Sequence, residues 1–246
     1  MKLHQTNLQV KRQSDVDEWG KFNLGRRLFT HMAAYDFALA ALLKAVVANK
    51  KVVAEYGCGD GIWLQYLAKE FPHKTFVGVE WNQKLYDYAK TKRLKNVDNV
   101  ELYRRDATKY CVDCDVWYAF GVVEHFNEAA DVMRLWTEHL SPNGFAVVTA
   151  PNLLNTLYVA QRNRLSLDKL VGKDEVVVDL YGFEQLWSHN TFLKKIMDAG
   201  LEILVFRIME ELPTERNMLA VAFKRGEKTW VGNSGEKLIQ RKMKPP

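Results

Sequence analysis

Short apolar runs rich in β-forming residues alternate along this chain with amphipathic segments whose apolar residues recur every three or four positions. Strands separated by helix-length segments pair in parallel and need crossover helices, so this alternation constrains the fold more than any other feature. We therefore expect an α/β fold with a seven-stranded, mostly parallel sheet and helices on both faces. The predicted strands are 51–56, 75–80, 100–104, 116–120, 145–150, 202–208 and 218–223.

Four of the intervening segments are predicted to be crossover helices, at 62–71, 83–94, 128–140 and 191–199. Several of their ends carry strong stop signals. Pro72 ends the first helix, the turn at 141–144 ends the third, and Gly200 follows the last as a C-terminal cap.

The 246 residues suffice for one hydrophobic core, and we expect a single domain over 1–246. Helical residues 16–48 are predicted to make residues 1–50 an N-terminal lid. The cofactor-binding core covers 51–225. Within it, residues 151–188 interrupt the alternation and include a possible helix at 153–164. Late insertions in open sheets commonly cover the ligand crevice, so this segment is predicted to be a second lid. The last residues, 226–246, read as a polar tail.

The composition is that of an ordinary soluble protein, with 48% hydrophobic and 26% charged residues. The net charge of +5 is modest and gives no strong argument for nucleic acid. No transmembrane segment or secretory signal is apparent, which favours a cytoplasmic protein without membrane contact. The three cysteines are too few for a disulfide framework; Cys111 and Cys114 form a C-x-x-C pair that indicates packing more than metal or redox chemistry.

The first strand runs through three glycines directly into a predicted helix, and this turn is the most informative segment of the chain. Gly57, Gly59 and Gly61 let the backbone turn sharply and a ligand approach without a Cβ in the way. A dinucleotide-binding turn places its third glycine three residues after its second, which differs from the spacing here. Glu55 would repel a phosphate and suits a ligand with a positively charged amino group.

This turn resembles the first motif of the class I S-adenosylmethionine-dependent methyltransferases, an acidic residue followed by glycines at every second position. Glu55, Gly57, Gly59 and Gly61 match that pattern residue by residue, with Cys58 inside the turn. The resemblance implies a Rossmann-like methyltransferase fold. It also implies S-adenosyl-L-methionine as cofactor and S-adenosyl-L-homocysteine as product.

Further strand ends continue the resemblance, which extends over 51–223. Glu80 ends the second strand, and a carboxylate there can accept hydrogen bonds from both ribose hydroxyls. Asp106 follows the third strand, where the family uses a carboxylate to accept from the adenine amino group. The remaining cofactor-binding residues implied by the family are Trp81 and Ala107 beside the adenine, and Phe120 and Gly121 under the methionine part.

His125 is the residue predicted to be catalytic. Methyl transfer is an in-line displacement, so much of the rate comes from holding the nucleophile and the methyl group in line. A hydroxyl or phenol acceptor also benefits from a base, and histidine suits this role at neutral pH. His125 follows the fourth strand, near the expected position of the methyl group. A histidine that only orients or caps the backbone is the alternative.

The neighbouring Glu124 raises a metal-dependent alternative. Certain ubiquinone-pathway O-methyltransferases and small-RNA 2′-O-methyltransferases carry Glu-x-x-Glu-His here and bind a divalent metal with it. This chain has Gly121 in place of their first glutamate. One carboxylate and one histidine make a poor metal site, even with His189 as a further ligand, so no metal is expected.

The acceptor is the least constrained part of the prediction. The segment 19–27 mixes aromatic and basic residues, as a lid over an anionic or aromatic substrate would. Tyr181, Phe183 and Trp187 either line an apolar pocket or close the core. We expect a small-molecule acceptor with an oxygen or nitrogen nucleophile. The alternatives are a methyltransferase that acts on RNA or protein and a non-catalytic S-adenosylmethionine-binding protein. A nicotinamide-dependent enzyme is a further alternative, but the glycine spacing argues against it.

Overall fold

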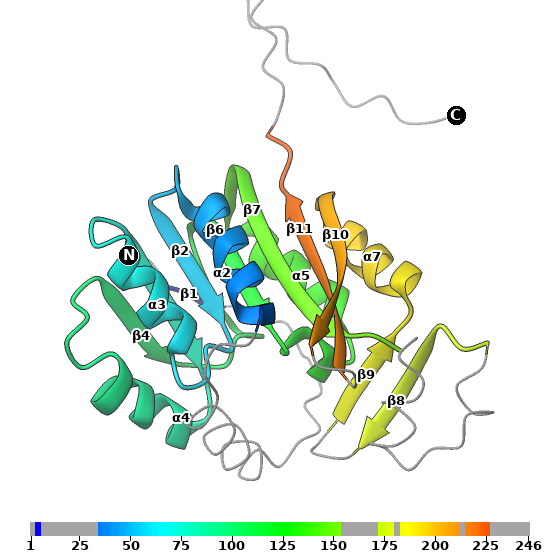
Figure 1. Ribbon diagram of the computed structural model, residues 1–246, viewed down its shortest axis with the longest axis horizontal. Helices are drawn as coiled ribbons and strands as arrows, with labels where there is room; N and C mark the ends of the chain where they lie inside the picture. The colour runs from blue at the N-terminus through cyan, green and yellow to red at the C-terminus, as the bar shows by residue number, and fades with distance from the viewer. Residues whose placement is uncertain (1–2, 6–33, 154–171, 180–182, 212–214, 227–246) are drawn as a thin grey trace, which may run out of the picture.

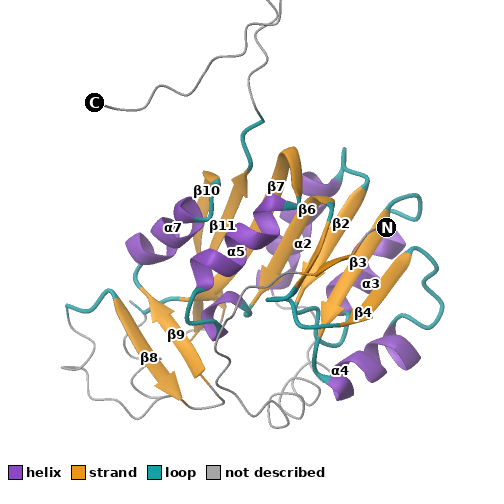
Figure 2. Ribbon diagram, turned by 180° about the vertical axis from the view of Figure 1, so that it is seen from behind, coloured by secondary structure: helices purple, strands orange, loops and turns teal. Residues whose placement is uncertain are grey.

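A seven-stranded sheet with helices on both faces forms the body of the protein (Figures 1 and 2). This arrangement confirms the predicted α/β fold class. The computed structural model describes residues 3–5, 34–153, 172–179, 183–211 and 215–226.

All seven predicted strands pair in this one sheet, in the order β10-β11-β7-β6-β2-β3-β4. The first three agree with the predicted bounds to within one residue, whereas the later strands are longer than predicted. Their bounds are β2 Val52–Tyr56, β3 Thr75–Glu80, β4 Val100–Arg104, β6 Cys114–Phe120, β7 Leu140–Pro151, β10 Glu202–Glu211 and β11 Glu215–Phe223.

The direction of the chain across the sheet reverses at β2. From β2 the chain moves outward to β3 and β4, then returns to β6 on the other side of β2, and all of these neighbours are parallel. β7 continues parallel to β6, while β11 inserts antiparallel between β7 and β10. In open sheets of this kind, ligands bind beyond the carboxyl ends of the strands at the reversal point, which here lies between β2 and β6.

The predicted crossover helices are present as α3 Ile62–Glu70, α4 Gln83–Tyr88 with the π-helical turn η1 Ala89–Arg93, α5 Ala129–Glu138 and α7 His189–Asp198. Side-chain caps fix two of their starts. Asn82 Oδ1 accepts from the Leu85 amide at 3.1 Å, and Ser188 Oγ accepts from the Thr191 amide at 3.3 Å. Of the predicted N-terminal helical region, the structure describes α2 Ala34–Val47.

The helices divide the core into two layers, one on each face of the sheet. Leu43 of α2 and Leu64 of α3 are buried on one face. Trp136 of α5 and Phe192 of α7 are buried on the other face, which Figure 2 shows in front. Trp136 stacks on Tyr56 with ring centroids 4.3 Å apart and donates from Nε1 to the Ala107 carbonyl at 2.7 Å. This contact joins the end of β2 to the helix layer.

Two small antiparallel sheets were not predicted. β1 Leu3–Gln5 pairs with β5 Tyr110–Val112, and β8 Glu175–Asp179 pairs with β9 Phe183–Trp187 inside the late insertion. Three-residue strands carry too little periodicity to be recognised, and the partner of β1 lies about a hundred residues away. The predicted helix at 153–164 lies outside the described residues except for its first residue, as do most of the N-terminal lid, Tyr181 and nearly all of the tail.

Within the described part of the chain, no helix has the length and apolar character needed to cross a bilayer.

Gly78, in the middle of β3, is a sharp test of this packing. A Cβ added there would lie 2.5 Å from Leu64 Cδ1 and 2.9 Å from Cys58 Sγ. Because these neighbours are buried between sheet and helix, we predict that Gly78→Ala lowers the free energy of unfolding by about 1–3 kcal/mol, the usual cost of overpacking. Urea denaturation followed by circular dichroism measures this. An unchanged midpoint would contradict the close contact of α3 with β3.

Candidate active site

The glycine turn after β2 adopts a backbone conformation that other residues rarely take. Gly57, Gly59 and Gly61 have φ angles of 69°, 56° and 77°, all in the left-handed region. The Gly57 amide donates to the Val79 carbonyl at 2.8 Å, and the Cys58 amide donates to the same carbonyl at 3.2 Å. The turn is therefore fastened to the end of β3.

The three glycines have different surroundings. A Cβ on Gly57 would lie 2.5 Å from Val122, and a Cβ on Gly61 would lie 3.1 Å from Leu94. A Cβ on Gly59 would meet no described atom within 4 Å. The outer glycines thus permit close packing, whereas the middle one faces open space at the carboxyl edge of the sheet. That space is where the predicted cofactor would approach the backbone.

Glu80, the residue predicted to bind the ribose, lies directly beside this turn. Its carboxylate is buried, with 5% of the residue exposed, and accepts from the Gly59 amide at Oε2, 2.9 Å away. Its other oxygen, Oε1, accepts from the Asn82 amide at 2.7 Å. A carboxylate offers about four acceptor positions, so two amide bonds orient it and are compatible with further donors from a ribose.

Glu55 is buried in the turn region and accepts from the Tyr118 hydroxyl at 3.0 Å. Burial raises the pKa of Tyr118 well above its ordinary value, and the nearby Glu55 charge raises it further. Tyr118 therefore remains a donor at neutral pH. This partner was not predicted, because only the pairing of β2 with β6 brings the two residues together.

A buried ion pair also supports the turn and was missed from the sequence. Arg93 Nη2 lies 2.7 Å from Asp60 Oδ2, and Asp60 is 3% exposed. The Arg93 carbonyl in turn accepts a hydrogen bond from Gln65 Nε2. Arg93 ends the π-helical turn η1, and the extra residue of such a turn changes the direction of the following side chains. The only sequence signal was an acidic residue between two glycines.

The predicted adenine side of the site is formed by the segments after β3 and β4. Trp81 is 41% exposed, which is uncommon among the large apolar side chains of the described residues. Asp106 Oδ1 accepts from the Thr108 amide at 2.9 Å and from the Thr108 hydroxyl at 2.8 Å, so this carboxylate also holds its own turn. Ala107 is buried, and its carbonyl accepts from Trp136, as described above.

The predicted methionine side follows β6. Phe120 is half-buried and meets the Trp63 ring edge-on at 5.8 Å. Gly121 has a φ of 65° and leads into the 3-10 turn η2 Val123–His125, where His125 is half-buried. The hairpin β8–β9 lies beside this turn, since Gln185 Nε2 donates to the Asn127 carbonyl at 3.3 Å. The late insertion is thus next to His125.

The remaining candidates belong to the core. Cys58 is buried against Gly78, so only its backbone faces the turn. Burial raises the pKa of the Cys111 thiol to about 12 and also raises that of Cys114, which supports the packing interpretation of this pair. Trp187 is fully buried and stacks on Phe192, so it closes the core. The side chain of Phe183 and the segment 19–27 lie outside the described residues.

Residues 54–146 match the model of a protein family described as a methyltransferase domain. The matched segment contains the glycine turn, Glu80, Asp106 and His125, and it includes the parallel strands β3, β4 and β6. This part of the chain is therefore similar to a methyltransferase domain. The predictions of an enzyme of this family and of S-adenosylmethionine as its cofactor are confirmed at the level of the family. No curated protein matches the methyltransferase sequence.

Many solved structures share the fold of this methyltransferase. An S-adenosylmethionine-dependent methyltransferase from Mesorhizobium loti superposes with a TM-score of 0.62 at 16% identity, covering 78% of this chain and 98% of that one. The 1,6-didemethyltoxoflavin-N1-methyltransferase of Burkholderia thailandensis, with 1,6-didemethyltoxoflavin and S-adenosylhomocysteine bound, gives a TM-score of 0.63 at 12% identity, covering 85% of this chain and 86% of that one. The magnesium protoporphyrin IX methyltransferase of Synechocystis PCC 6803, with S-adenosylhomocysteine bound, gives 0.61 at 15%, covering 86% and 97%.

The open space over Gly59 generates a prediction with a matched control. Gly59→Ala should leave the methyltransferase folded but weaken S-adenosylmethionine binding at least tenfold, about 1.4 kcal/mol, because the new methyl group fills the ligand space. Gly172→Ala is the control. Gly172 has a φ of 71° and no described atom within 4 Å of an added Cβ, but it lies in the turn before β8.

Both substitutions carry the same backbone strain of roughly 1–2 kcal/mol. Titration calorimetry separates that strain from the effect on binding. Equal affinities in the two variants would show that Gly59 does not face the cofactor.

Proposed function

We propose that this methyltransferase transfers a methyl group from S-adenosylmethionine to an oxygen or nitrogen atom of a small molecule. The observation that carries the proposal is the glycine turn fastened to Glu80, with Gly59 facing open space at the reversal point of the sheet. Glu80 suits a ribose, whereas Glu55, two residues before the first glycine, would repel a diphosphate, and the glycine spacing differs from that of a dinucleotide-binding turn. This argues against a nicotinamide cofactor.

In this proposal each part of the cofactor has its own protein segment. Glu80 accepts from the ribose hydroxyls, and Asp106 with the Ala107 backbone receives the adenine beside the exposed Trp81 ring. The glycine turn and the segment at Phe120 and Gly121 hold the methionine part, near the buried Glu55. The support is that these residues follow neighbouring strands at the carboxyl edge of the sheet. The list of proposed cofactor contacts is thus Glu55, Gly57, Cys58 (through its backbone), Gly59, Gly61, Glu80, Trp81, Asp106, Ala107, Phe120 and Gly121.

A small-molecule acceptor is supported by the neighbours of known activity. The Burkholderia thailandensis and Synechocystis enzymes methylate, according to their names, 1,6-didemethyltoxoflavin and magnesium protoporphyrin IX. The hairpin β8–β9 supplies a wall for such a molecule, because it contacts the segment after His125. An RNA or protein acceptor remains the second candidate, and acceptor screening distinguishes the two. The cytoplasmic location stays a prediction.

His125 is proposed to assist the transfer as a base. The acceptor lone pair forms the new bond to the methyl carbon as the carbon–sulfur bond breaks, and S-adenosylhomocysteine leaves as a neutral thioether. The proton of the acceptor then passes to the His125 imidazole. The support for this role is that His125 lies in η2, the turn that follows the carboxyl end of β6, where the methionine part of the cofactor is proposed to bind.

The cofactor proposal is tested first on Glu80. Glu80→Gln keeps the size of the side chain but replaces one acceptor oxygen with a donor, so a ribose hydroxyl loses its charged partner. We expect S-adenosylmethionine to bind about 10- to 100-fold more weakly, as hydrogen bonds to charged groups contribute roughly 1.5–3 kcal/mol. Titration calorimetry of wild type with S-adenosylmethionine, S-adenosylhomocysteine and NAD gives the reference, with NAD expected not to bind.

Glu101→Gln is the control, because Glu101 lies inside the neighbouring strand β4, away from the carboxyl edge. Glu101 accepts a hydrogen bond from the Tyr103 hydroxyl at 2.7 Å. Unchanged affinity in Glu80→Gln, or an equal loss in both variants, would contradict the ribose assignment.

A test of the role of His125 first needs an acceptor. Small molecules that carry a hydroxyl or amine group are screened for those that cause release of S-adenosylhomocysteine. With that acceptor, His125→Gln should lower kcat about 10²- to 10⁴-fold, the usual range for a general base, without changing cofactor affinity. The loss should shrink as the pH rises, because hydroxide takes over removal of the proton. A uniform loss at every pH, or weaker cofactor binding, would indicate a structural histidine.

A further inference from the structure

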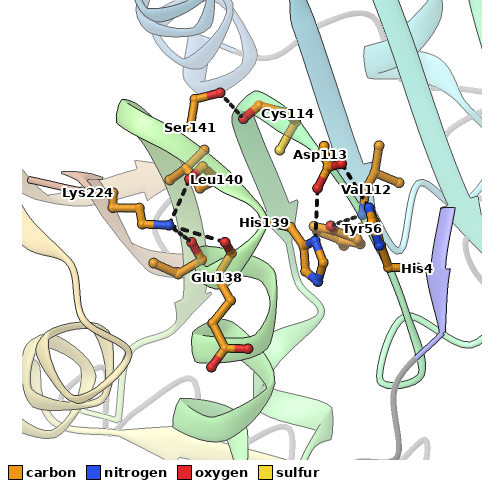
Figure 3. Close-up of polar contacts among 11 residues, drawn as sticks. His4, Tyr56, Val112, Asp113, Cys114, Glu138, His139, Leu140, Ser141 and Lys224 are labelled. Carbon is orange, nitrogen blue, oxygen red and sulfur yellow. Dashed lines mark hydrogen bonds and ion pairs between the residues drawn. The ribbon is translucent and has the colours of Figure 1, made fainter. Parts of the chain in front are cut away.

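Three polar side chains lie together at the amino ends of the strands, opposite the proposed cofactor site. His4 Nε2 lies 2.8 Å from Asp113 Oδ2, and His139 Nδ1 lies 2.9 Å from the other oxygen, Oδ1. The two imidazole rings lie face to face with a tilt of 32°, and their centroids are 4.4 Å apart. Figure 3 shows the histidines on either side of the Asp113 carboxylate. Three segments far apart in sequence thus present one nitrogen, one carboxylate and one nitrogen to the same point.

The backbone around this group is held independently of the side chains. His4 is placed by the pairing of β1 with β5, in which it lies opposite Cys111. The Cys114 amide donates to the His139 carbonyl at 3.1 Å, which joins the two backbones next to Asp113. On the other side, the Val112 amide donates to the Tyr56 hydroxyl at 3.1 Å. The side chains are therefore positioned before any ligand arrives.

We propose that His4, Asp113 and His139 bind a divalent transition metal of the zinc type. The ligand atoms all lie within 4.8 Å of one another. A tetrahedral zinc ion with bonds of about 2.0–2.1 Å needs ligand atoms about 3.3 Å apart. Small side-chain rotations therefore convert the hydrogen-bonded group into a coordinating one.

The donor set decides the class of metal. Two imidazole nitrogens and one carboxylate suit zinc, cobalt or nickel, whereas magnesium and calcium prefer oxygen ligands throughout. The side chains of His4, His139 and Asp113 are 34%, 21% and 57% exposed. Water can therefore complete the coordination.

The position of the group indicates what the metal does. Asp113 precedes β6 and His139 precedes β7, so the group lies at the amino ends of these strands. The proposed cofactor contacts follow the carboxyl ends. The metal therefore takes no part in methyl transfer. The metal links the N-terminal strand β1 to the body of the domain. Without it, β1 is held in the described structure mainly by its three-residue pairing with β5.

The test is zinc titration of the full-length protein after removal of metals with a chelator, followed by removal of the chelator. Calorimetry should detect one zinc ion per chain, and zinc should raise the Tm because it binds only the folded state. Magnesium, titrated in parallel, should have no effect. His4→Ala and His139→Ala should each weaken zinc binding by more than about 100-fold. Loss of a residue that only hydrogen-bonds to a metal ligand costs roughly 10- to 100-fold.

His73→Ala is the matched control, because His73 is an exposed histidine outside the group, and its zinc affinity should equal that of wild type. His4→Ala alters only the short strand β1 outside the main sheet. Circular dichroism is used to check that this variant folds. Absence of zinc binding would overturn the proposal and leave a hydrogen-bonded cluster. Zinc binding that survives His4→Ala or His139→Ala would also overturn it, since the metal would then sit elsewhere.

Discussion

The fastening of the glycine turn to the end of β3 is the constraint on which the site depends. Amides of the turn donate to the Val79 carbonyl and to the Glu80 carboxylate, so β2 and β3 hold one loop between them. Glu80 is buried and has charge-assisted hydrogen bonds, which are stronger than neutral ones. The proposed ribose ligand is therefore also the residue that shapes the turn, and its orientation is set before the cofactor binds.

The packing around the turn follows from that arrangement. Gly57 lies against Val122, in the segment after β6, and Gly61 lies against Leu94, which follows the π-helical turn η1. The turn can approach these two segments so closely only because neither glycine has a Cβ. Arg93 then reaches the buried Asp60 from η1. A buried carboxylate left without a cation would be costly, so this ion pair and the course of η1 depend on each other. The close packing leaves Gly59 as the place where the backbone is open to a ligand.

The two edges of the sheet have different chemistry. The carboxyl edge carries Glu55, Glu80 and Asp106 beside open backbone, as a nucleoside with a positively charged amino acid part requires. The amino edge carries Asp113 between two histidines, a donor set for a metal of the zinc type. The proposed metal site and the proposed active site are thus separated by the length of the strands, and a substitution in one should leave the other intact.

The sequence alone determined the sheet and its seven strands, and it also carries the motif on which the proposed cofactor edge rests. Strand and helix periodicity is local, and a motif such as Glu55 to Gly61 lies within a single turn, so both are visible in a linear pattern. Tertiary structure decided the pairs that join distant segments. Tyr118 on Glu55, Arg93 on Asp60, and the group of His4, Asp113 and His139 each depend on which strands and helices become neighbours. No local pattern records these contacts, because each side chain taken singly has the ordinary appearance of a surface or core residue.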